Sequence, residues 1–316
     1  TLDGDRSLRR RPMRRVAGPL RQMGAHITLA DGDVAPVRID DGAALHGIEY
    51  ALPVASAQVK SALLLAGAFA EGTTVLRGLI HSRDHTERMF PHFGVHVEAR
   101  RDEIVIDGGQ TWHSANVVVP ADPSTAAFWI AAATIVPDSQ LELTNVLLNP
   151  TRTGFIDVLR RMGANIEAEI ERSEPERVGT LRVRGAALQA TTVTGDEIPA
   201  MIDEIPLVAV LATYAHGTTA IRGAEELRVK ESDRIETVAQ NLRAMGARIE
   251  TLPDGFVIDG PQRLHGARIE PHGDHRIAMA FSIAALGAEG TTQIDGAECA
   301  SVSYPKFYET LAELTR

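Results

Sequence analysis

Hydrophobic and polar positions along the chain follow two recurring patterns, each of which predicts a helix followed by a strand. The first pattern is an amphipathic run, a glycine and then alternating residues, as in Leu20-Arg-Gln-Met-Gly24-Ala-His-Ile. Similar phrases contain Gly94, Gly163 and Gly246, so the pattern returns after about seventy to eighty residues. Glycine adopts the positive φ that ends a helix without steric penalty, and alternation is typical of a half-buried strand. Each glycine is therefore predicted to follow a helix and to precede a strand.

The second pattern is an apolar helix, a Gly-Thr-Thr turn and a strand that ends in glycine. It occurs at residues 72–78, 217–223 and 290–296, and a degenerate copy follows the apolar stretch 126–135. The preceding helices, such as the one over residues 62–70, are apolar nearly all round and should be buried. Together the two patterns predict repeated βαβαββ units, each with two helices and several strands.

The number of units indicates how the chain is organised into domains. A chain of 316 residues exceeds the size at which a single hydrophobic core usually stops growing. Four such units suggest two domains of related units rather than a solenoid of small repeats. Prolines interrupt the pattern at Pro120-Ala-Asp-Pro-Ser124. We therefore expect an α/β protein with two domains, residues 1–120 and residues 121–316.

Composition and charge argue against several classes of protein. Hydrophobic residues make up 44% and charged residues 23% of the chain, as in an ordinary globular protein. The formal charge of −10 argues against binding of nucleic acid. The sequence shows no signal-peptide pattern and no apolar run of membrane length. Cys299 is the single cysteine, so no internal disulfide forms and a reducing compartment, the cytoplasm, is expected.

An arginine stands near the predicted start of the first helix in every unit. These residues are Arg11, Arg83, Arg152 and Arg234. A positive charge at a helix N-terminus opposes the helix dipole, so each arginine invites a compensating anion. Guanidinium groups match phosphate and carboxylate groups bidentately. If the helix starts converge, they form a site for a small substrate that carries several such groups.

The second helices begin with polar clusters. The clusters are Ser56-Ala-Gln58, Asp122-Pro-Ser124-Thr125, Asp203-Glu204 and Asp274-His275-Arg276. Capping of the helix N-terminus accounts for Ser124 and Thr125. For Asp203, capping and a role as general base are equally good interpretations, because a carboxylate in a positive, water-excluded site suits proton transfer.

Further candidates lie in the stretch Leu227-Arg-Val-Lys-Glu-Ser-Asp-Arg234, where a helix is predicted to start near Ser232 or Asp233. Glu231 is interpreted either as an ion-pair partner of Lys230 or Arg234, or as a proton-transfer group. Outside this stretch, His275 fits a buried or supporting role better than a catalytic one. No spacing of His, Cys and Asp matches a metal site. We therefore expect neither a metal nor a cofactor.

Several stretches resemble the EPSP synthase family, and its class II branch most closely. In chain order they are Gly4-Asp-Arg-Ser-Leu-Arg-Arg-Arg11-Pro-Met, Ala55-Ser-Ala-Gln-Val-Lys-Ser-Ala, Ser82-Arg-Asp-His-Thr-Glu-Arg-Met89, Asp203-Glu-Ile-Pro, Arg228-Val-Lys-Glu-Ser-Asp-Arg234 and Asp274-His-Arg-Ile-Ala-Met279. The resemblance implies an EPSP synthase-like fold of two inverse α/β barrel domains. Each domain would contain three βαβαββ units, one domain would be incomplete here, and the active site would lie in the cleft between them.

The resemblance also implies an activity and the residues that carry it. The activity is transfer of the enolpyruvyl group of phosphoenolpyruvate to the 5-hydroxyl of shikimate 3-phosphate, by addition and then elimination. Asp203 would be the general base, and Glu231 beside Lys230 would handle the proton at the methylene carbon. The residues implied for shikimate 3-phosphate are Ser56, Ala57, Gln58, Arg83, Asp203 and Lys230. Those implied for phosphoenolpyruvate are Arg11, Gln58, Arg234 and Arg276. The first domain would form the shikimate 3-phosphate side and the second the phosphoenolpyruvate and proton-transfer side.

Two departures from the family pattern stand out. Val302 occupies a position where some class I members have lysine, which is a minor difference. The larger one is that the family's opening Leu-Pro-Gly-Ser-Lys-Ser motif and its Gly-Asn-x-Gly-Thr motif have no counterpart, and the chain starts at Thr1 without an initiator Met. We therefore expect that a substrate-binding N-terminal segment is missing, that the chain alone is nearly inactive, and that a sheet edge is exposed.

Three interpretations of the chain remain open at this stage. The first is an enzyme of this family, monomeric when complete, which is represented here by a fragment or by one half of a split pair whose missing segment a separate chain supplies. The second is an inactive or partner-dependent fragment that only binds ligand. The third is a UDP-N-acetylglucosamine enolpyruvyl transferase, which has the same fold, although the stretch Lys230-Glu-Ser-Asp-Arg234 argues against it.

Overall fold

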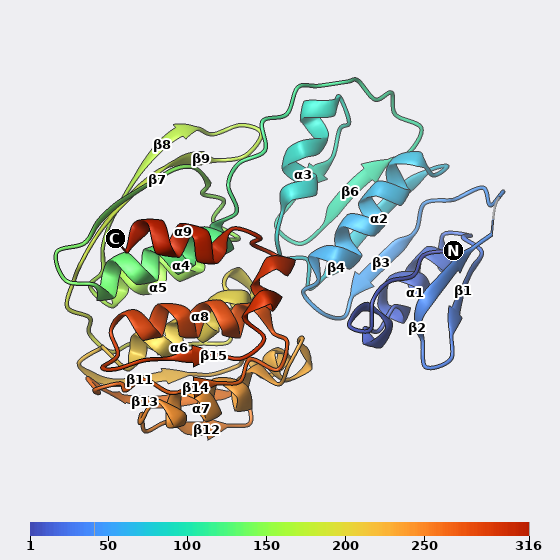
Figure 1. The fold of residues 1–316 in the computed structure, drawn as a ribbon. Coiled ribbons are helices and arrows are strands. Elements are labelled where there is room, and N and C mark those ends of the chain that lie inside the picture. Colours follow the sequence, from blue (N-terminus) through green and yellow to red (C-terminus); the bar gives the residue numbers. More distant parts are fainter. Residues whose placement is uncertain (41, 316) are drawn as a thin grey trace. The chain divides into compact units, whose positions relative to one another are not determined.

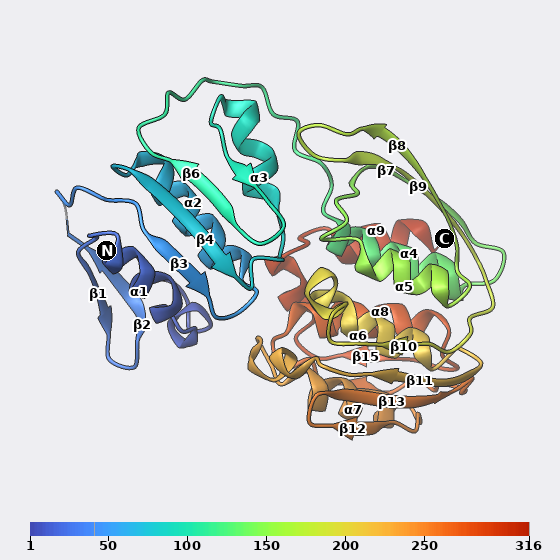
Figure 2. The same ribbon diagram turned by 180° about the vertical axis from the view of Figure 1, so that it is seen from behind.

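The computed structural model describes residues 1–40 and 42–315, and the chain divides into two compact units. Unit 1 is Thr1–Val118 with Glu174–Glu176, and unit 2 is Val119–Ser173 with Arg177–Arg316. Each unit is an α/β structure with an apolar core of its own. Figure 1 labels the helices and strands of both units, and Figure 2 shows them from behind.

Unit 1 contains one complete copy of the βαβαββ unit, preceded by a helix and a hairpin. The preceding elements are η1 (Leu8–Arg10), α1 (Arg14–Gln22), β1 (Ile27–Ala30) and β2 (Val34–Ile39). The complete copy consists of β3 (Glu49–Leu52), α2 (Ala57–Phe69), β4 (Thr73–Gly78), α3 (His85–Met89), η2 (Phe90–Phe93), β5 (Glu98–Ala99) and β6 (Ile104–Asp107). Its sheet has the order β3-β4-β6-β5, in which β3 and β4 are parallel and the other neighbours antiparallel.

Unit 2 repeats this architecture along the rest of the chain. Its first part consists of α4 (Pro123–Ile135), β7 (Gln140–Leu147), α5 (Gly154–Arg161), β8 (Asn165–Arg172) and β9 (Val178–Arg184). The second part consists of β10 (Thr192–Val193), η3 (Ile198–Ala200), η4 (Ile202–Glu204), α6 (Ile205–Ala212), β11 (Gly217–Ile221), η5 (Glu225–Val229), α7 (Arg234–Ala244), β12 (Glu250–Leu252) and β13 (Gly255–Gly260). The third part consists of β14 (Arg268–Ile269), α8 (His275–Leu286), β15 (Gln293–Ile294), η6 (Ala297–Val302) and α9 (Phe307–Leu314).

Sheet order confirms that the units are copies of one design. The order β10-β11-β13-β12 in unit 2 matches β3-β4-β6-β5 in unit 1, again with one parallel and two antiparallel pairs. The order β7-β9-β8 follows the same scheme, with a parallel bridge from Ala121 to Val146 in the place of the first strand. The predicted α/β fold of repeated βαβαββ units is therefore confirmed.

Glycines end the first helices as the sequence pattern predicts. Gly24, Gly94, Gly163 and Gly246 have φ of 101°, 79°, 92° and 87° and follow α1, η2, α5 and α7. A side chain is disfavoured in this left-handed region, which explains why the same residue type recurs there. The turn it makes lets the chain fold back from each helix into the next strand.

The apolar helices α4, α6 and α8 form the centre of unit 2. They pack against one another, and in Figures 1 and 2 they lie side by side among the strands of the unit. Every residue of α6 is buried. Burial on all sides matches their composition, because a helix that is apolar all round is stable only when it is covered all round.

Helix α2 departs from the prediction that the apolar helices are buried. Leu65 is 46% and Phe69 68% exposed, although the opposite face of α2 packs on β4, β6 and α1. The physical reason is the number of helices: three apolar helices cover one another in unit 2, whereas α2 is the one such helix in the described part of unit 1. Phe69 is covered in part by a stacked Trp112, with ring centroids 5.3 Å apart.

No helix within residues 1–40 and 42–315 is long and apolar enough to cross a membrane.

Two glycines, one inside α1 and one just after it, allow a paired test of the role of positive φ. Gly24 has φ of 101°, and a Cβ there would lie 3.1 Å from the carbonyl oxygen of Ala44. Gly24→Ala should therefore lower the free energy of unfolding by about 1–2 kcal/mol. Gly18 lies inside the helix, and a Cβ added there would meet nothing within 4 Å, so Gly18→Ala should raise stability by about 0.5–1 kcal/mol. Urea unfolding measures both, and shifts of the same sign would contradict the explanation.

Candidate active site

Arg234 is the centre of the largest cluster of charged side chains in unit 2. It is the first residue of α7 and only 1% exposed, although it carries a full positive charge. Its Nε donates to Asp274 Oδ2 at 2.8 Å, its Nη2 donates to Glu231 Oε2 at 2.8 Å, and its Nη1 donates to Asp203 Oδ1 at 3.3 Å. A buried guanidinium with carboxylates on three sides is oriented rigidly.

Asp274 joins α7 to α8. It is the N-cap of α8, accepts the backbone N–H of Arg276 at 3.0 Å and also accepts the hydroxyl of Ser232 at 3.1 Å. Burial raises the pKa of the Asp274 carboxyl, but the adjacent Arg234 guanidinium outweighs burial and holds the pKa below its ordinary value. Asp274 is therefore an ionised carboxylate at neutral pH.

Asp203 and Glu204 lie in η4, immediately before α6. The N-cap of α6 is Glu204, and it makes no capping hydrogen bond through its side chain. Asp203 is thus not the N-cap residue of α6, and its carboxylate lies 3.3 Å from Arg234 Nη1 and 3.8 Å from Arg276 Nη2. The role of Asp203 as a general base stays a prediction.

Glu204 is buried beneath the cluster and is 3% exposed. Its Oε1 lies 3.4 Å from Arg276 Nη1. Burial raises the pKa of the Glu204 carboxyl, and the negative charge of Asp203 acts in the same direction, while Arg276 opposes them. Sequence reasoning gave Glu204 no role, since neither its burial nor its distance from Arg276 is visible in the motif Asp-Glu-Ile-Pro.

Lys230 and Glu231 immediately precede the start of α7. Glu231 pairs with Arg234, as one of its two interpretations predicts. Burial lowers the pKa of the Lys230 ammonium, an effect that Asp203 opposes. A lowered pKa makes lysine a readier proton donor.

His275 follows Asp274 as the first residue of α8 and is buried. Burial lowers the pKa of the imidazole, and the positive charge of Arg276 lowers it further. The ring is therefore neutral at pH 7, which agrees with the buried role expected from the sequence.

Arg152, near the start of α5, has its charge compensated by the protein itself. Its Nη2 donates to Asp122 Oδ1 and to Ser124 Oγ, both at 2.8 Å. Asp122 is the N-cap of α4, just as Asp274 is the N-cap of α8. The sequence suggested that arginines at helix starts invite a bound anion. At Arg152 and Arg234, carboxylates of the chain itself already bind the guanidinium where an external anion was expected.

The remaining candidates lie in unit 1. Ser56 is the N-cap of α2 and accepts the backbone N–H of Val59 at 3.4 Å, and Ala57 is the first residue of that helix. The side-chain oxygen of Gln58 accepts a hydrogen bond of 2.7 Å from Arg15 of α1. Arg11 is exposed just before α1, and Arg83 lies in the segment between β4 and α3.

The structure thus brings two groups of predicted residues together, one in each unit. In unit 2 the group consists of Asp203, Lys230, Glu231, Arg234 and Arg276. In unit 1 Ser56, Ala57 and Gln58 form the start of α2, and Arg83 lies on the segment that leads to α3. Within residues 1–40 and 42–315, no three His, Cys, Asp or Glu side chains are grouped to hold a metal ion.

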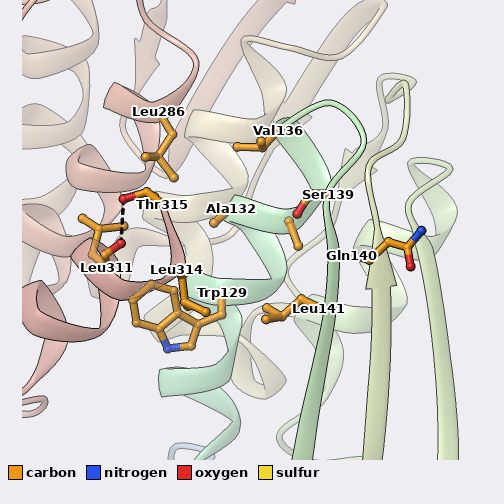
Figure 3. A pocket seen from close by; sticks show the side chains of 11 residues that line it. Trp129, Ala132, Val136, Ser139, Gln140, Leu141, Leu286, Leu311, Leu314 and Thr315 are labelled. Atoms are coloured by element: carbon orange, nitrogen blue, oxygen red, sulfur yellow. Dashed lines mark hydrogen bonds between the residues drawn. The ribbon is translucent and has the colours of Figure 1, made fainter.

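An apolar cavity of about 430 Å³ in unit 2 lies apart from these groups. Trp129, Leu286, Leu311 and Leu314 contribute to its wall (Figure 3). Leu286 is the last residue of α8, whereas Asp274 of the charged cluster caps the other end of that helix. Since α8 has 12 residues, its two ends are about 18 Å apart. The cavity therefore has no part in the charged cluster.

Comparison with known proteins identifies relatives over nearly the whole chain. The family model described as EPSP synthase (3-phosphoshikimate 1-carboxyvinyltransferase) matches residues 1–311. The 3-phosphoshikimate 1-carboxyvinyltransferase of Synechococcus sp. (strain JA-3-3Ab) is 53% identical, with 99% of this chain and 71% of the relative covered. The protein of that name from Alkaliphilus oremlandii is 50% identical, with 100% of this chain and 74% of the relative covered.

Solved structures agree with these sequence relatives. EPSP synthase from Acinetobacter baumannii superposes with a TM-score of 0.89 at 42% identity, over 99% of this chain and 72% of that one. The enolpyruvyl transferase NikO from Streptomyces tendae gives 0.80 at 22% identity, over 98% of this chain and 72% of that one, and supports the fold alone. Repeated βαβαββ units and a cluster of cations with carboxylates define an α/β enzyme for small anionic substrates. The chain belongs to the EPSP synthase family.

Replacement of Asp274 tests the ion pair with Arg234. Asp274→Asn leaves the buried guanidinium without its strongest carboxylate, so the free energy of unfolding should fall by about 3–5 kcal/mol at pH 7. Because the pKa of Asp274 is depressed in the folded state, the difference from the wild type should shrink as the pH falls below the ordinary carboxyl value of 3.8. Denaturant unfolding of both proteins across this pH range measures the difference in free energy of unfolding.

The control for Asp274→Asn is Asp233→Asn, at the N-cap of α7. Asparagine caps a helix as well as aspartate does, and the ion pair of Asp233 with Arg228 is partly exposed, so the loss should stay below about 1 kcal/mol. Equal losses at the two positions would show that the Arg234 pair has no special weight.

Glu204 should make stability fall as pH rises. Its pKa is raised in the folded state, so the folded chain holds the proton more tightly than the unfolded chain. That contribution is full below the ordinary value of 4.5 and is lost as the pH passes through the folded pKa. Glu204→Gln removes the titration, so its free energy of unfolding should gain on the wild type as the pH rises above 4.5. Glu225→Gln, at an exposed position, is the control. A constant difference between Glu204→Gln and the wild type across this range would contradict the raised pKa.

Proposed function

We infer that this chain catalyses the transfer of the enolpyruvyl group of phosphoenolpyruvate to the 5-hydroxyl of shikimate 3-phosphate. The products are 5-enolpyruvylshikimate 3-phosphate and phosphate. The chain is thus a transferase of the shikimate pathway, which leads to chorismate and the aromatic amino acids. Family membership and the names of relatives that match nearly all of the chain support this function.

One observation supports the assignment of the chemistry to unit 2: Arg234 contacts both Asp203 and Glu231. Two carboxylates on one buried guanidinium are held within reach of the same small ligand. We assign Asp203 as the general base. It takes the proton of the 5-hydroxyl of shikimate 3-phosphate while the hydroxyl oxygen attacks C2 of phosphoenolpyruvate. Glu231, with Lys230 beside it, delivers a proton to the methylene carbon.

The addition gives a tetrahedral ketal phosphate, and elimination then completes the transfer. A proton leaves the methyl carbon that was formed in the first step, the carbon–carbon double bond returns, and the carbon–oxygen bond to phosphate breaks. We assign Glu231 as the group that takes back this proton. A carboxylate that first donates a proton to a carbon and then takes one back must keep a fixed position through both steps. The buried Arg234 would hold Glu231 in that position.

Phosphoenolpyruvate binding is assigned to Arg11, Gln58, Arg234 and Arg276. Arg234 is already bonded to carboxylates, so an incoming anion must share the guanidinium with them. A protonated Glu231 would bind Arg234 less strongly than the carboxylate does and would leave more of its N–H groups to the ligand. Protonation of Glu231, which the addition step requires, and binding of the anion would therefore support each other.

Shikimate 3-phosphate binding is assigned to Ser56, Ala57, Gln58 and Arg83, with Asp203 and Lys230. The start of α2 offers a hydroxyl and backbone N–H groups, and Arg83 offers a guanidinium for the phosphate. In domain terms, residues 1–120 would form the shikimate 3-phosphate side and residues 121–316 the phosphoenolpyruvate and proton-transfer side. The proposal places the reaction in the cytoplasm. The enzyme would act as a monomer or with a separate chain that contributes further substrate-binding residues.

Phosphate release tests the function and the role of Asp203 together. The 316-residue chain is assayed with both substrates, alone and with the N-terminal segment of the Synechococcus relative added. Release should depend on shikimate 3-phosphate, and UDP-N-acetylglucosamine should not replace it. Asp203→Asn should lower the rate by about 10²- to 10⁴-fold, the usual contribution of a general base. Asp196→Asn, at an exposed position of the same unit, should not.

Two results would count against this proposal. Absence of phosphate release by the wild-type chain with the segment added would refute the enzymatic function. Release that is equally fast in Asp203→Asn would leave the function in place but remove Asp203 from the proton transfer.

A further inference from the structure

Lys60 is a buried charge in unit 1 that none of the assigned roles uses. It lies in the second turn of α2 and is 1% exposed. Its Nζ lies 2.6 Å from Glu87 Oε1 of α3. The same ammonium donates to the carbonyl oxygens of Ile80 and Ser82, at 3.3 and 3.4 Å. Its three N–H donors therefore have three acceptors, on two different segments of the chain.

Stability alone does not explain this arrangement. Removing an ammonium and a carboxylate from water costs several kcal/mol for each ion, and apolar residues of similar volume are often as stable in their place. The surrounding helix is apolar, so a leucine or methionine would be the simpler solution at position 60. The ion pair fixes the geometry of the groups that it joins, because hydrogen bonds constrain the positions of their partners and apolar contacts do so far less.

The segments joined by Lys60 are the two that carry the proposed shikimate 3-phosphate ligands of unit 1. On one side lies the start of α2, where Lys60 itself follows Gln58 after one residue. On the other lies the segment from Ile80 to α3, where Ser82 directly precedes Arg83. A second polar contact between the helices, Ser61 Oγ to Thr86 Oγ1 at 2.6 Å, lies one residue from each member of the pair.

We propose that the Lys60–Glu87 pair is a positioning element for shikimate 3-phosphate. It holds the segment of Arg83 at a fixed distance from Ser56 and Gln58, so that the hydroxyl, the amide and the guanidinium are in place before the ligand arrives. A site that is preformed in this way avoids the cost of ordering its segments on binding. The proposal rests on the proposed function, since it concerns the ligand of the same site.

The test replaces both charges by apolar residues of similar size. In Lys60→Met/Glu87→Met no charge remains buried without a partner, so the fold should be kept, whereas the carbonyl groups of Ile80 and Ser82 lose their donor. The dissociation constant for shikimate 3-phosphate, from calorimetric titration, should rise at least about tenfold. With both substrates, KM for shikimate 3-phosphate should rise in parallel, while kcat stays within about threefold, because Lys60 touches no reacting group.

The control is Ile106→Val, in the core of the same unit and 1% exposed. It should lower stability by about 0.5–1.5 kcal/mol without changing the dissociation constant. Hydrogen exchange gives a readout that needs no ligand: amides of residues 79–84 should exchange faster in the double variant and at the wild-type rate in Ile106→Val. Unchanged exchange in the double variant would overturn the proposal.

The binding data separate failure of this proposal from failure of the proposed function. If the wild-type chain binds shikimate 3-phosphate and the double variant binds it equally well, the positioning role is wrong and the function stands. If Ile106→Val weakens binding as much as the double variant does, the effect is one of general stability and the positioning role is again wrong. If the wild-type chain does not bind shikimate 3-phosphate even with the N-terminal segment of the Synechococcus relative added, the assigned site itself is wrong, and the positioning role falls with it.

Discussion

The buried ion pair between Arg234 and Asp274 is the interaction on which the arrangement of the site in unit 2 depends. Both side chains are almost completely excluded from solvent. Asp274 caps α8 while Arg234 begins α7, so two hydrogen bonds between these side chains hold the starts of the two helices together. A guanidinium held in this way has few orientations left. Asp203 and Glu231 therefore meet a cation whose position does not depend on them.

Unit 2 contains two ion pairs between an arginine near one helix start and the N-cap carboxylate of another helix. Comparing them distinguishes what the fold provides from what the neighbouring residues add. Arg152 bonds to Asp122, the N-cap of α4, as Arg234 bonds to Asp274. In both cases an arginine near the start of one helix meets the carboxylate that caps another, in the same repeat for Arg152 and in the following repeat for Arg234. The surroundings differ, since a serine hydroxyl accompanies Arg152 and two further carboxylates accompany Arg234. The repeat thus provides a charged anchor, and the neighbouring residues decide whether it supports a reaction.

Sequence patterns predicted most of the fold and proposed the residues that the structure groups around Arg234, but they did not predict the pairing of Arg234 with Asp274. Glycines at positive φ and the start of α7 at Asp233 follow from local chemistry, which the sequence displays directly. The bond from Arg234 to Asp274 joins residues 40 positions apart, and its existence depends on how α7 packs beside α8. The burial of Glu204 and the exposed face of α2 have the same origin. They are properties of neighbouring helices, which local sequence does not encode.

Units 1 and 2 use different buried cations for a similar task. The guanidinium of Arg234 is planar and donates hydrogen bonds to carboxylates along its edges, which suits a site where anions and protons are exchanged. Lys60 has a compact ammonium that meets one carboxylate and two backbone carbonyl groups. Backbone carbonyl groups do not titrate, so two of the three contacts of Lys60 do not depend on the protonation of a side chain. Arg234, among side-chain carboxylates, can therefore exchange partners with a substrate anion, whereas Lys60, bonded to Glu87 and to two backbone carbonyl groups, holds two segments of the chain in place.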